Sequence, residues 1–290
     1  MRDDRPPAVS IVVPCFKGER FLAEALESCL RQSYEDFEVI VVDDESPDRC
    51  GEIAEAFAAR DSRVLVIRRP ANGGVSAAFN EGFGKARGKF FTRLAQDDWF
   101  MPDAIGWMLE ALESQPEAGL VYCDEQQIDE NGALLGVYHK PEPEALFSEG
   151  HKVGLCVMWR REVYEKIGGF DSRFDAAEDY DYWQRAREHF QFIHCTKGVA
   201  LSQRIHREMG TQLFSARQEI AAAHIRARGV TGAARRRILA EGFFNAAWNE
   251  GSRGRRRAAL RYLAASWRQW PFDARIYKTF VRLLFSPRIA

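Results

Sequence analysis

Two pairs of adjacent aspartates are the side chains of this sequence best placed to do chemistry. Asp43-Asp44 and Asp97-Asp98 each follow a short apolar run. Carboxylates this close together at the end of a buried segment must be solvated, protonated or neutralised by a cation. A hard divalent cation that carries a substrate phosphate would suit such a pair, whereas an exposed acidic turn would explain either pair taken alone.

A third acidic cluster, EDYD at residues 178–181, comes just before the apolar positions Tyr182 and Trp183 of a predicted helix. The positive end of the helix macrodipole lies at the N-terminus and stabilises carboxylates there. Simple N-capping is therefore the interpretation that we favour for Glu178.

The first two acidic pairs are positioned by an alternation of strands and helices. Apolar, β-branched runs predict four strands, and the segments between them carry helical periodicity. The predicted strands are Val9–Val13, Val39–Val42, Val64–Ile67 and Phe90–Leu94. Three helices are predicted. The first has an apolar face from Phe21 to Leu30, the second starts at Ser46-Pro47, and the third spans Val75–Ala86. This order predicts right-handed βαβ units and a parallel sheet.

The carboxyl ends of parallel strands lie at one edge of a sheet, and ligands bind at that edge in open α/β folds. If the strands before the two aspartate pairs are neighbours, both pairs lie along the same edge. One pair could then contact a nucleotide base and ribose, and the other a metal-bound diphosphate. We therefore favour a nucleotide crevice over a random acidic surface.

The second half of the domain is predicted to be mixed. Asn131-Gly132 is typical of a hairpin turn, and Gly168-Gly169 of a helix end. The predicted elements are a helix from after Pro102 to Ser114, strands Leu120–Cys123, Gln126–Asp129, Leu134–Tyr138 and Leu155–Trp159, a surface loop at 140–152, a helix Arg161–Ile167, and a last strand Val199–Ile205 followed by His206.

Composition sets the broad class of the protein. The chain has 290 residues, and 46% of them are hydrophobic, which is ordinary for a globular protein. Six scattered cysteines without a C-x-x-C pair argue against a zinc site or a disulfide scaffold and fit a reducing cytosol. The first residues lack the apolar core of a signal peptide. The sequence nowhere has the 18 consecutive apolar residues that would predict a membrane span. We therefore expect a cytoplasmic location.

The charge is unevenly spread along the chain. From Arg226 onward the sequence has 14 arginines and one lysine but only three acidic residues. This part therefore carries a net charge of +12, although the whole chain carries −1. After Thr211 the pattern predicts three or four helices, with breaks near Gly229–Gly232, Gly251–Gly254 and Pro271. Aromatic and basic residues alternate there. They predict either a helical anchor on an anionic membrane or the aromatic core of a small helical subdomain. No nucleic-acid-binding module is present.

Three blocks of this sequence, in one consistent order, resemble family 2 glycosyltransferases. Residues 9–48 (VSIVVPCFKGERF to VIVVDDESPD) resemble the start of that family. Residues 72–105 (NGGVSAAFNEGF to QDDWFMPDAI) match the block with its DXD-like metal site, and residues 168–186 (GGFDSRFDAAEDYDYWQRA) the block with its catalytic base. The resemblance covers residues 8–210. It implies the α/β, Rossmann-like GT-A fold, with a mostly parallel central sheet flanked by helices.

The resemblance also implies a domain organisation. Residues 1–210 would form the glycosyltransferase domain, with a nucleotide-sugar half at 8–123 and an acceptor half at 124–210. Residues 211–290 would form a basic, helical C-terminal appendage.

The family's nucleotide-binding residues map onto the first half of the chain. Pro14 and Phe16 would line the base pocket, Asp44 would contact the base, and Asp43 would support the pocket. Asn80 falls where the family has an Asn in its nucleotide block.

The resemblance assigns the chemistry to four further residues. Asp98 would bind Mg²⁺ or Mn²⁺, and Asp97 would hold the ribose or a metal-bound water. His206 lies near where some members place a His that contacts the diphosphate or metal, although a lone His after a strand is often structural. Asp179 matches the general base.

Two positions depart from the family pattern. Gln96 stands where many members have an Asp, so metal binding depends on Asp98, because Gln96 adds no charge. Phe79 stands where many relatives carry an Arg before the Asn, and Arg93 could supply the missing cation.

The expected reaction is an inverting transfer of a sugar from a nucleotide-sugar, with UDP favoured, to a hydroxyl of a glycan or lipid-linked acceptor. Peripheral contact with the inner face of a membrane through residues 211–290 is also expected. Nucleic acid is not expected as a partner. The alternative is a non-catalytic sugar-nucleotide-binding or assembly subunit of a glycan biosynthesis complex. A nucleotidyltransferase fits poorly, because the first turn, PCFKGE, lacks a Gly-rich basic loop. A dehydrogenase fits poorly as well, because no G-x-G-x-x-G follows the first strand.

Overall fold

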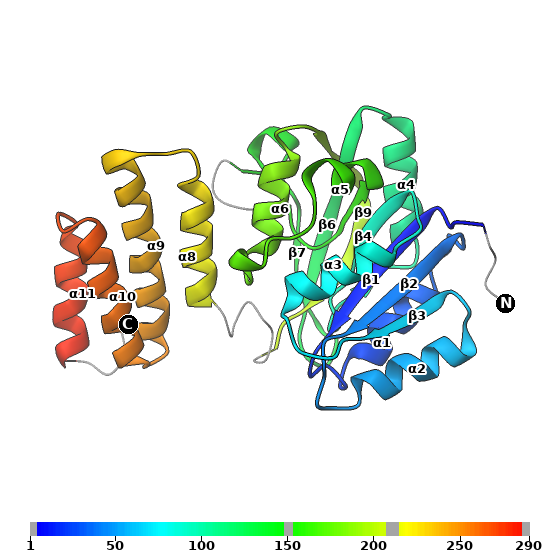
Figure 1. Ribbon diagram of the computed structural model, residues 1–290, viewed down its shortest axis with the longest axis horizontal. Coiled ribbons are helices and arrows are strands. Elements are labelled where there is room, and N and C mark those ends of the chain that lie inside the picture. The colour runs from blue at the N-terminus through cyan, green and yellow to red at the C-terminus, as the bar shows by residue number, and fades with distance from the viewer. Residues whose placement is uncertain (1–4, 148–152, 207–214, 286–290) are drawn as a thin grey trace. The chain divides into compact units, whose positions relative to one another are not determined.

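The computed structural model describes residues 5–147, 153–206 and 215–285. It divides into two compact units (Figure 1). The first unit comprises Met1–Ser172 and Tyr182–His206, and the second comprises Arg173–Asp181 and Arg207–Ala290. The nine residues 173–181, which carry the third acidic cluster, therefore group with the C-terminal part of the chain.

A nine-stranded sheet forms the centre of the first unit, in the order β3-β2-β1-β4-β8-β6-β9-β5, with β7 paired to β6. The strands β1 to β4 are mutually parallel where they pair, and β6 pairs parallel with β9. The strands are β1 Val9–Cys15, β2 Phe37–Asp43, β3 Val64–Arg68, β4 Phe90–Arg93, β5 Trp99–Phe100, β6 Ala118–Ile128, β7 Leu134–Tyr138, β8 Val157–Arg160 and β9 Gln191–Arg204.

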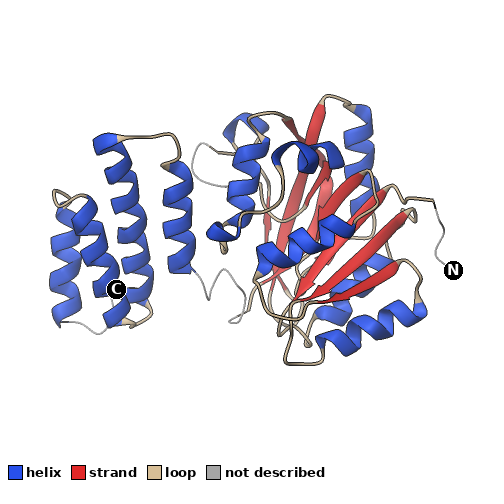
Figure 2. Cartoon of the chain, viewed as in Figure 1, coloured by secondary structure: helices blue, strands red, loops and turns tan. Residues whose placement is uncertain are grey.

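Helices cover both faces of this sheet (Figure 2). Successive side chains of a strand point to opposite faces, so Ile11 and Val13 of β1 pack on one side and Val12 on the other. The first face is covered by α1 Leu22–Leu30, α2 Cys50–Arg60 and α4 Ala104–Ser114. The second face is covered by α3 Val75–Lys85, α5 Arg161–Ile167 and the Tyr182–Ala186 part of α6 Glu178–Ala186. Two short 3₁₀ helices, η1 Pro143–Ala145 and η2 Ser172–Phe174, complete the description.

The predicted parallel strands and the hairpin are confirmed, but several details differ. The predicted strands Leu120–Cys123 and Gln126–Asp129 form one continuous strand, β6, because it pairs with β9 along most of its length. Strands β2 and β4 each pair with β1, so β1 separates the two aspartate pairs at the shared edge. Helix α2 begins at Cys50 and not at Ser46, because the hydroxyl of Ser46 and the carboxylate of Asp48 bond to each other and to loop amides. Strand β9 begins at Gln191, well before the predicted Val199, since it pairs with β6 along most of its length.

Four helices make up the described C-terminal part of the second unit, as predicted. They are α8 Ser215–Arg226, α9 Gly232–Ser252, α10 Arg256–Gln269 and α11 Ala274–Phe285. The breaks lie near the predicted positions, around Gly229, Gly254 and Pro271, and Gly229 and Gly254 adopt positive φ angles of 72° and 76°. A small apolar core holds α9, α10 and α11 together, around Phe244, Leu263 and Ile276. No helix in the described ranges combines the length and the apolar character needed to cross a bilayer.

Candidate functional site

The loops that follow β1 and β2 are bonded to each other at the carboxyl edge of the sheet. The backbone N–H of Lys17 donates to Ser46 Oγ at 2.7 Å, and that of Glu19 donates to Asp48 Oδ2 at 3.0 Å. Each loop also contains a non-glycine residue in the left-handed region, Lys17 at φ 55° and Glu45 at φ 57°. Such conformations persist only where the surroundings impose them, and they cluster at ligand sites.

Gln96 joins the loop after β4 to the loop after β1. Its Oε1 accepts the N–H of Phe16 at 2.8 Å, and its Nε2 donates to the carbonyl of Phe16 at 3.0 Å. A Cβ at Gly18 would overlap the Gln96 amide, so a larger residue here would displace that amide. The ring of Phe16 stays 38% exposed at this edge, and Pro14 lies within β1, paired with Val42. Gln96 therefore holds in place the loop predicted to line the base pocket.

Asp44 is buried, and its carboxylate is bonded inside the protein. Gly73 N–H donates to Oδ1 at 3.0 Å, Gly74 N–H donates to Oδ2 at 2.9 Å, and the guanidinium of Arg69 forms an ion pair with it. Gly74 has a φ of 83° and immediately precedes α3. Asp44 thus joins the end of β2 to the start of α3, and its contact with a base stays a prediction.

Asp43 is also buried, and its Oδ1 accepts the N–H of Ser46 at 2.9 Å. Burial raises the pKa of Asp43, and this effect outweighs the lowering by the Ser46 N–H and by Arg68. Asp43 thus holds the 45–49 loop, and its support of a nucleotide pocket stays a prediction.

Asp98 lies just beyond the end of β4 and is only 3% exposed. Its Oδ1 accepts the backbone N–H of Arg204 at 2.9 Å. Burial, and then the neighbouring charge of Asp97, raise the pKa of Asp98 well above its ordinary value. A carboxyl in such a place is stabilised in its charged form by a cation.

Asp97 contacts His206, although the two residues are far apart in the sequence. His206 Nε2 lies 2.8 Å from Asp97 Oδ2, and the imidazole packs against the ring of Phe21. The antiparallel pairing of β5 with β9, with Trp99 opposite Ser202, brings the two residues together. The structure therefore places His206 beside the acidic pair.

The donor set at this edge fits a divalent cation that is carried by its substrate. Asp97, Asp98 and His206 supply the oxygen and nitrogen atoms, yet no three His, Cys, Asp or Glu residues in the described part of the chain form a ready-made cage for an ion. Mg²⁺ is commonly held by one or two carboxylates plus substrate phosphates. A cation here would need phosphate oxygens to complete its coordination.

Asn80 and Phe79 take part in packing on the second face of the sheet. The Asn80 amide bonds the backbone of Phe170 in both directions, at 2.7 and 2.8 Å. The ring of Phe79 stacks on Phe170, and the buried Arg93 lies over Phe79. A nucleotide contact by Asn80 and a phosphate contact by Arg93 stay predictions.

Asp179 lies in the first turn of α6, in the part of that helix that belongs to the second unit. Its Oδ1 accepts the N–H of Tyr180 at 2.7 Å. Glu178 accepts the N–H of Ala176 at 3.1 Å, a bond to the turn that precedes the helix, and its capping of the helix stays a prediction. Ala176 itself has a φ of 82°, a strained value for a residue with a Cβ.

Sequence reasoning missed a group of titratable side chains around the middle of β6. The two carboxylate oxygens of Asp124 lie 2.6 Å from His139 Nδ1 and 2.8 Å from His194 Nε2. Tyr122 stacks flat on His194, with the ring centroids 4.9 Å apart. The only signal for this group is the register of β6 against β9, which pairs Tyr122 with His194. A single sequence does not reveal that register.

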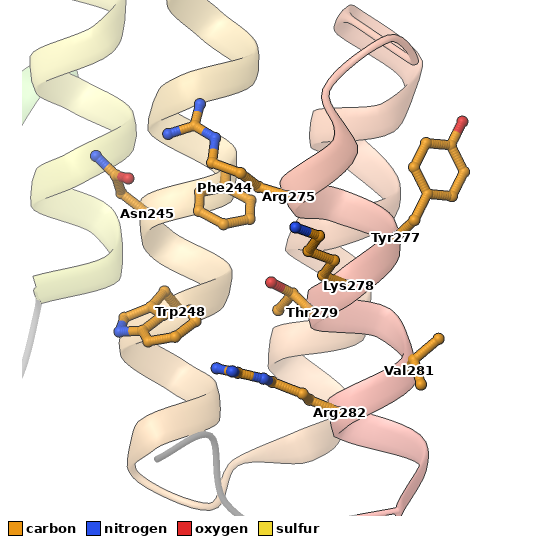
Figure 3. A pocket seen from close by; sticks show the side chains of 9 residues that line it. All are labelled: Phe244, Asn245, Trp248, Arg275, Tyr277, Lys278, Thr279, Val281 and Arg282. Atoms are coloured by element: carbon orange, nitrogen blue, oxygen red, sulfur yellow. The ribbon is translucent and has the colours of Figure 1, made fainter.

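The second unit contains a groove of about 900 Å³ between α9 and α11. Its walls combine rings and cations, among them Phe244, Trp248, Lys278 and Arg282. Figure 3 shows Lys278 and Arg282 directed from α11 toward α9. Arg275, which also lines the groove, is held by Asp273. The groove is therefore basic and aromatic.

Comparison with known sequences shows the family. Residues 10–168 match the model of glycosyl transferase family 2. The chain is 35% identical over 191 residues to the O-antigen biosynthesis protein RfbC of Myxococcus xanthus, a match that covers 64% of this chain and 15% of that protein. It is also 35% identical over 191 residues to EpsJ, an uncharacterized glycosyltransferase of Bacillus subtilis, with 60% of this chain and 54% of EpsJ covered. The chain thus spans about half the length of these relatives, or less.

Comparison with solved structures shows the fold. S. aureus TarS in complex with UDP-GlcNAc superposes with a TM-score of 0.65 at 16% identity, over 92% of this chain and 82% of that one. The mannosyltransferase PcManGT of Pyrobaculum calidifontis, in complex with GDP-Man and Mn²⁺, gives a TM-score of 0.61 at 18% identity, over 98% and 82%. With its mostly parallel sheet and flanking helices, this chain belongs to glycosyl transferase family 2 and has the GT-A fold.

Proposed function

We propose that this chain transfers a sugar from a nucleotide-sugar donor to a hydroxyl acceptor, with UDP as the favoured nucleotide. The observation that carries the proposal is the convergence of the loops after β1, β2 and β4 at one sheet edge, held together by Gln96 and Ser46. Structures of the same fold contain UDP-GlcNAc or GDP-Man, which supports a nucleotide-sugar donor. In this proposal residues 8–123 bind the donor and residues 124–210 shape the acceptor site.

The donor-binding residues would act as follows. Phe16, with Pro14 beside it, offers an exposed ring on which a base can stack. Asp43 holds the 45–49 loop, and Asp44 holds the start of α3 and is also the candidate for a direct contact with the base. Asn80, on α3, is a further candidate for a contact with the nucleotide.

Asp98, with His206 and Asp97 beside it, would hold a Mg²⁺ or Mn²⁺ ion on the diphosphate. When bound, such an ion neutralises the charge that grows on the leaving group. The buried carboxyl of Asp98, whose pKa is raised by burial and by Asp97, supports this assignment, because a cation relieves both causes.

Asp179 would serve as the general base. A hydroxyl is a weak nucleophile, and a positioned carboxylate that accepts its proton typically contributes about 10²–10⁴-fold to the rate. Attack from the face opposite the diphosphate would invert the anomeric centre, as the family resemblance implies.

A donor panel tests the proposed function. Thermal unfolding of the full chain is followed with UDP-, GDP- and dTDP-sugars, each with and without MnCl₂, and release of the nucleoside diphosphate is then measured for every donor that stabilises the protein. Stabilisation with turnover supports a transferase. Stabilisation without turnover toward any hydroxyl acceptor would favour the non-catalytic subunit, and no stabilisation by any donor would reject both.

The acceptor and the place of action are proposed from the C-terminal helices. Three apolar residues of α11, Tyr277, Phe280 and Val281, recur at helical spacing and are each about half exposed. Lys278 and Arg282 lie next to them. An amphipathic, basic helix of this kind binds the surface of anionic membranes. We propose peripheral contact with the inner, cytoplasmic face of a membrane, where a glycan or lipid-linked acceptor would be met.

A further inference from the structure

We propose that the helical C-terminal unit positions the candidate base, through an ion pair between Arg228 and the buried carboxylate of Asp181. This inference rests on the proposed function, because it gives Asp179 the role of base. The residues 173–181 that carry Asp179 belong to the same compact unit as the C-terminal helices.

Arg228 contacts the segment on both sides of Asp179. Its guanidinium forms an ion pair with Asp181, whose side chain is fully buried. The same guanidinium lies over the ring of Phe174, with its carbon 5.5 Å from the ring centroid. One side chain from the α8–α9 connection thus meets the residues before and after the candidate base.

The helical geometry explains why this contact would aim Asp179. Asp181 follows Asp179 by two residues, which places the two side chains about 200° apart around the axis of α6. The N–H of Asp181 already donates to the carbonyl of Ala177 at 3.1 Å, so the first turn is formed. A cation that holds Asp181 on the buried side therefore turns Asp179, which is partly exposed, to the opposite side.

The turn that enters α6 also needs outside support. Ala176 has a φ of 82°, and its N–H donates to Glu178. Such a conformation persists only when the surroundings impose it. The contacts of Arg228 with Phe174 and Asp181 lie on either side of this residue and supply part of that constraint.

Arg228 is in turn held by the packing of the C-terminal helices. Its N–H donates to the carbonyl of Ile225 at 3.0 Å, at the end of α8, and Gly229 follows with a positive φ. Helices α8 and α9 approach so closely that a Cβ at Gly242 would overlap Ala223. The position of the arginine is therefore set by the helical unit as a whole.

The test compares Arg228→Ala, Arg228→Lys and the control Arg226→Ala in the full chain. Arg226 is an exposed arginine two residues away, on α8. The donor that gives the largest stabilisation in the panel above is used, with water or a simple alkyl glycoside as the acceptor. We expect Arg228→Ala to lower kcat by about 10²-fold with a donor KM close to that of the wild type, since displacing a catalytic group by about 1 Å costs this much.

The lysine variant distinguishes positioning from simple destabilisation. Lysine keeps the charge but loses the planar guanidinium, so we expect a kcat between those of the wild type and Arg228→Ala. Thermal unfolding of each variant is measured in parallel, and Arg228→Lys carries the test if Arg228→Ala does not fold. An unchanged kcat in the folded variants, or a donor KM that rises in proportion as kcat falls, would overturn the inference.

Asp179→Asn, measured in the same assay, separates this inference from the proposed function. Loss of transfer with retained donor binding supports Asp179 as the base. If Asp179→Asn is inactive and Arg228→Ala is normal, the positioning role fails while the proposed base stands. If Asp179→Asn still transfers sugar at the wild-type rate, the base assignment itself fails.

Discussion

At the scale of single residues, Gln96 shows how an amide can replace a carboxylate with a different task. An amide has both a donor and an acceptor, so it satisfies the N–H and the C=O of Phe16 at once. An ionised carboxylate is an acceptor only and could not bond that carbonyl. The departure from the family's acidic pattern is thus explained by a contact between two loops that bound the proposed donor site.

We therefore predict that Gln96→Glu raises the donor KM and destabilises the fold by about 1 kcal/mol, because the carbonyl of Phe16 loses its donor. Gly18→Ala should have a similar effect, since the new Cβ displaces the same amide. In a double-mutant cycle with Gln96→Ala, the cost of Gly18→Ala should largely vanish. Donor KM values and urea unfolding measure both effects, and strictly additive losses would contradict the coupling.

A second prediction concerns Asp98. Asp98→Ala should remove the dependence of UDP binding on Mn²⁺, because the carboxylate proposed to hold the ion is gone. Isothermal titration with UDP, with and without MnCl₂, measures this dependence. The matched control is Asp103→Ala, at an exposed aspartate. UDP binding that still depends on Mn²⁺ in Asp98→Ala would reject the assignment of Asp98 as a metal ligand.

At the scale of elements, the pairing of β6 with β9 brings Asp124 to His194 and creates a pH-dependent contribution to stability. Burial alone would raise the pKa of Asp124, but the N–H of Lys140 and the rings of His139 and His194 outweigh it, so the net pKa is lowered. A carboxyl whose pKa is lowered in the folded state stabilises the fold at any pH above the pKa of the unfolded state. That contribution is lost as the pH falls through the pKa of the folded state.

We predict that Asp124→Asn is less stable than the wild type near neutral pH and that the difference shrinks as the pH falls below about 4. Urea unfolding midpoints of the two proteins over an acidic pH series measure the difference. A gap that stays constant over this series would show that Asp124 does not contribute through its charge.

At the scale of the whole molecule, the basic C-terminal helices are expected to bind anionic membranes. Flotation of the full chain with vesicles of phosphatidylcholine, with or without phosphatidylglycerol, measures this binding. We predict that Phe280→Ser/Val281→Ser weakens flotation with the anionic vesicles, because the apolar face of α11 is lost, and that added salt weakens it further.

The control is Leu134→Ser/Leu135→Ser, which removes an apolar pair from β7 in the other unit that is at least as exposed. Equal flotation of the α11 variant and the wild type would refute membrane contact through this helix. Equal loss in the two variants would point to nonspecific adsorption.

The sequence by itself determined those features that depend on neighbouring residues. The alternation of apolar runs and helical periodicity predicted the parallel strands β1 to β4, and the glycines at 229 and 254 predicted the breaks between the C-terminal helices. The ordered blocks predicted the family. All of these signals are local, because they follow from the period of a strand or a helix and from the backbone preferences of glycine.

Only the tertiary structure decided which distant groups meet. The strand β1 lies between the two acidic pairs, Gln96 reaches Phe16, His194 reaches Asp124, and Arg228 reaches Asp181. These partners are 47 to 80 residues apart. Their pairing follows from strand order, register and packing across the whole chain, and a side chain's own sequence neighbours carry no record of it.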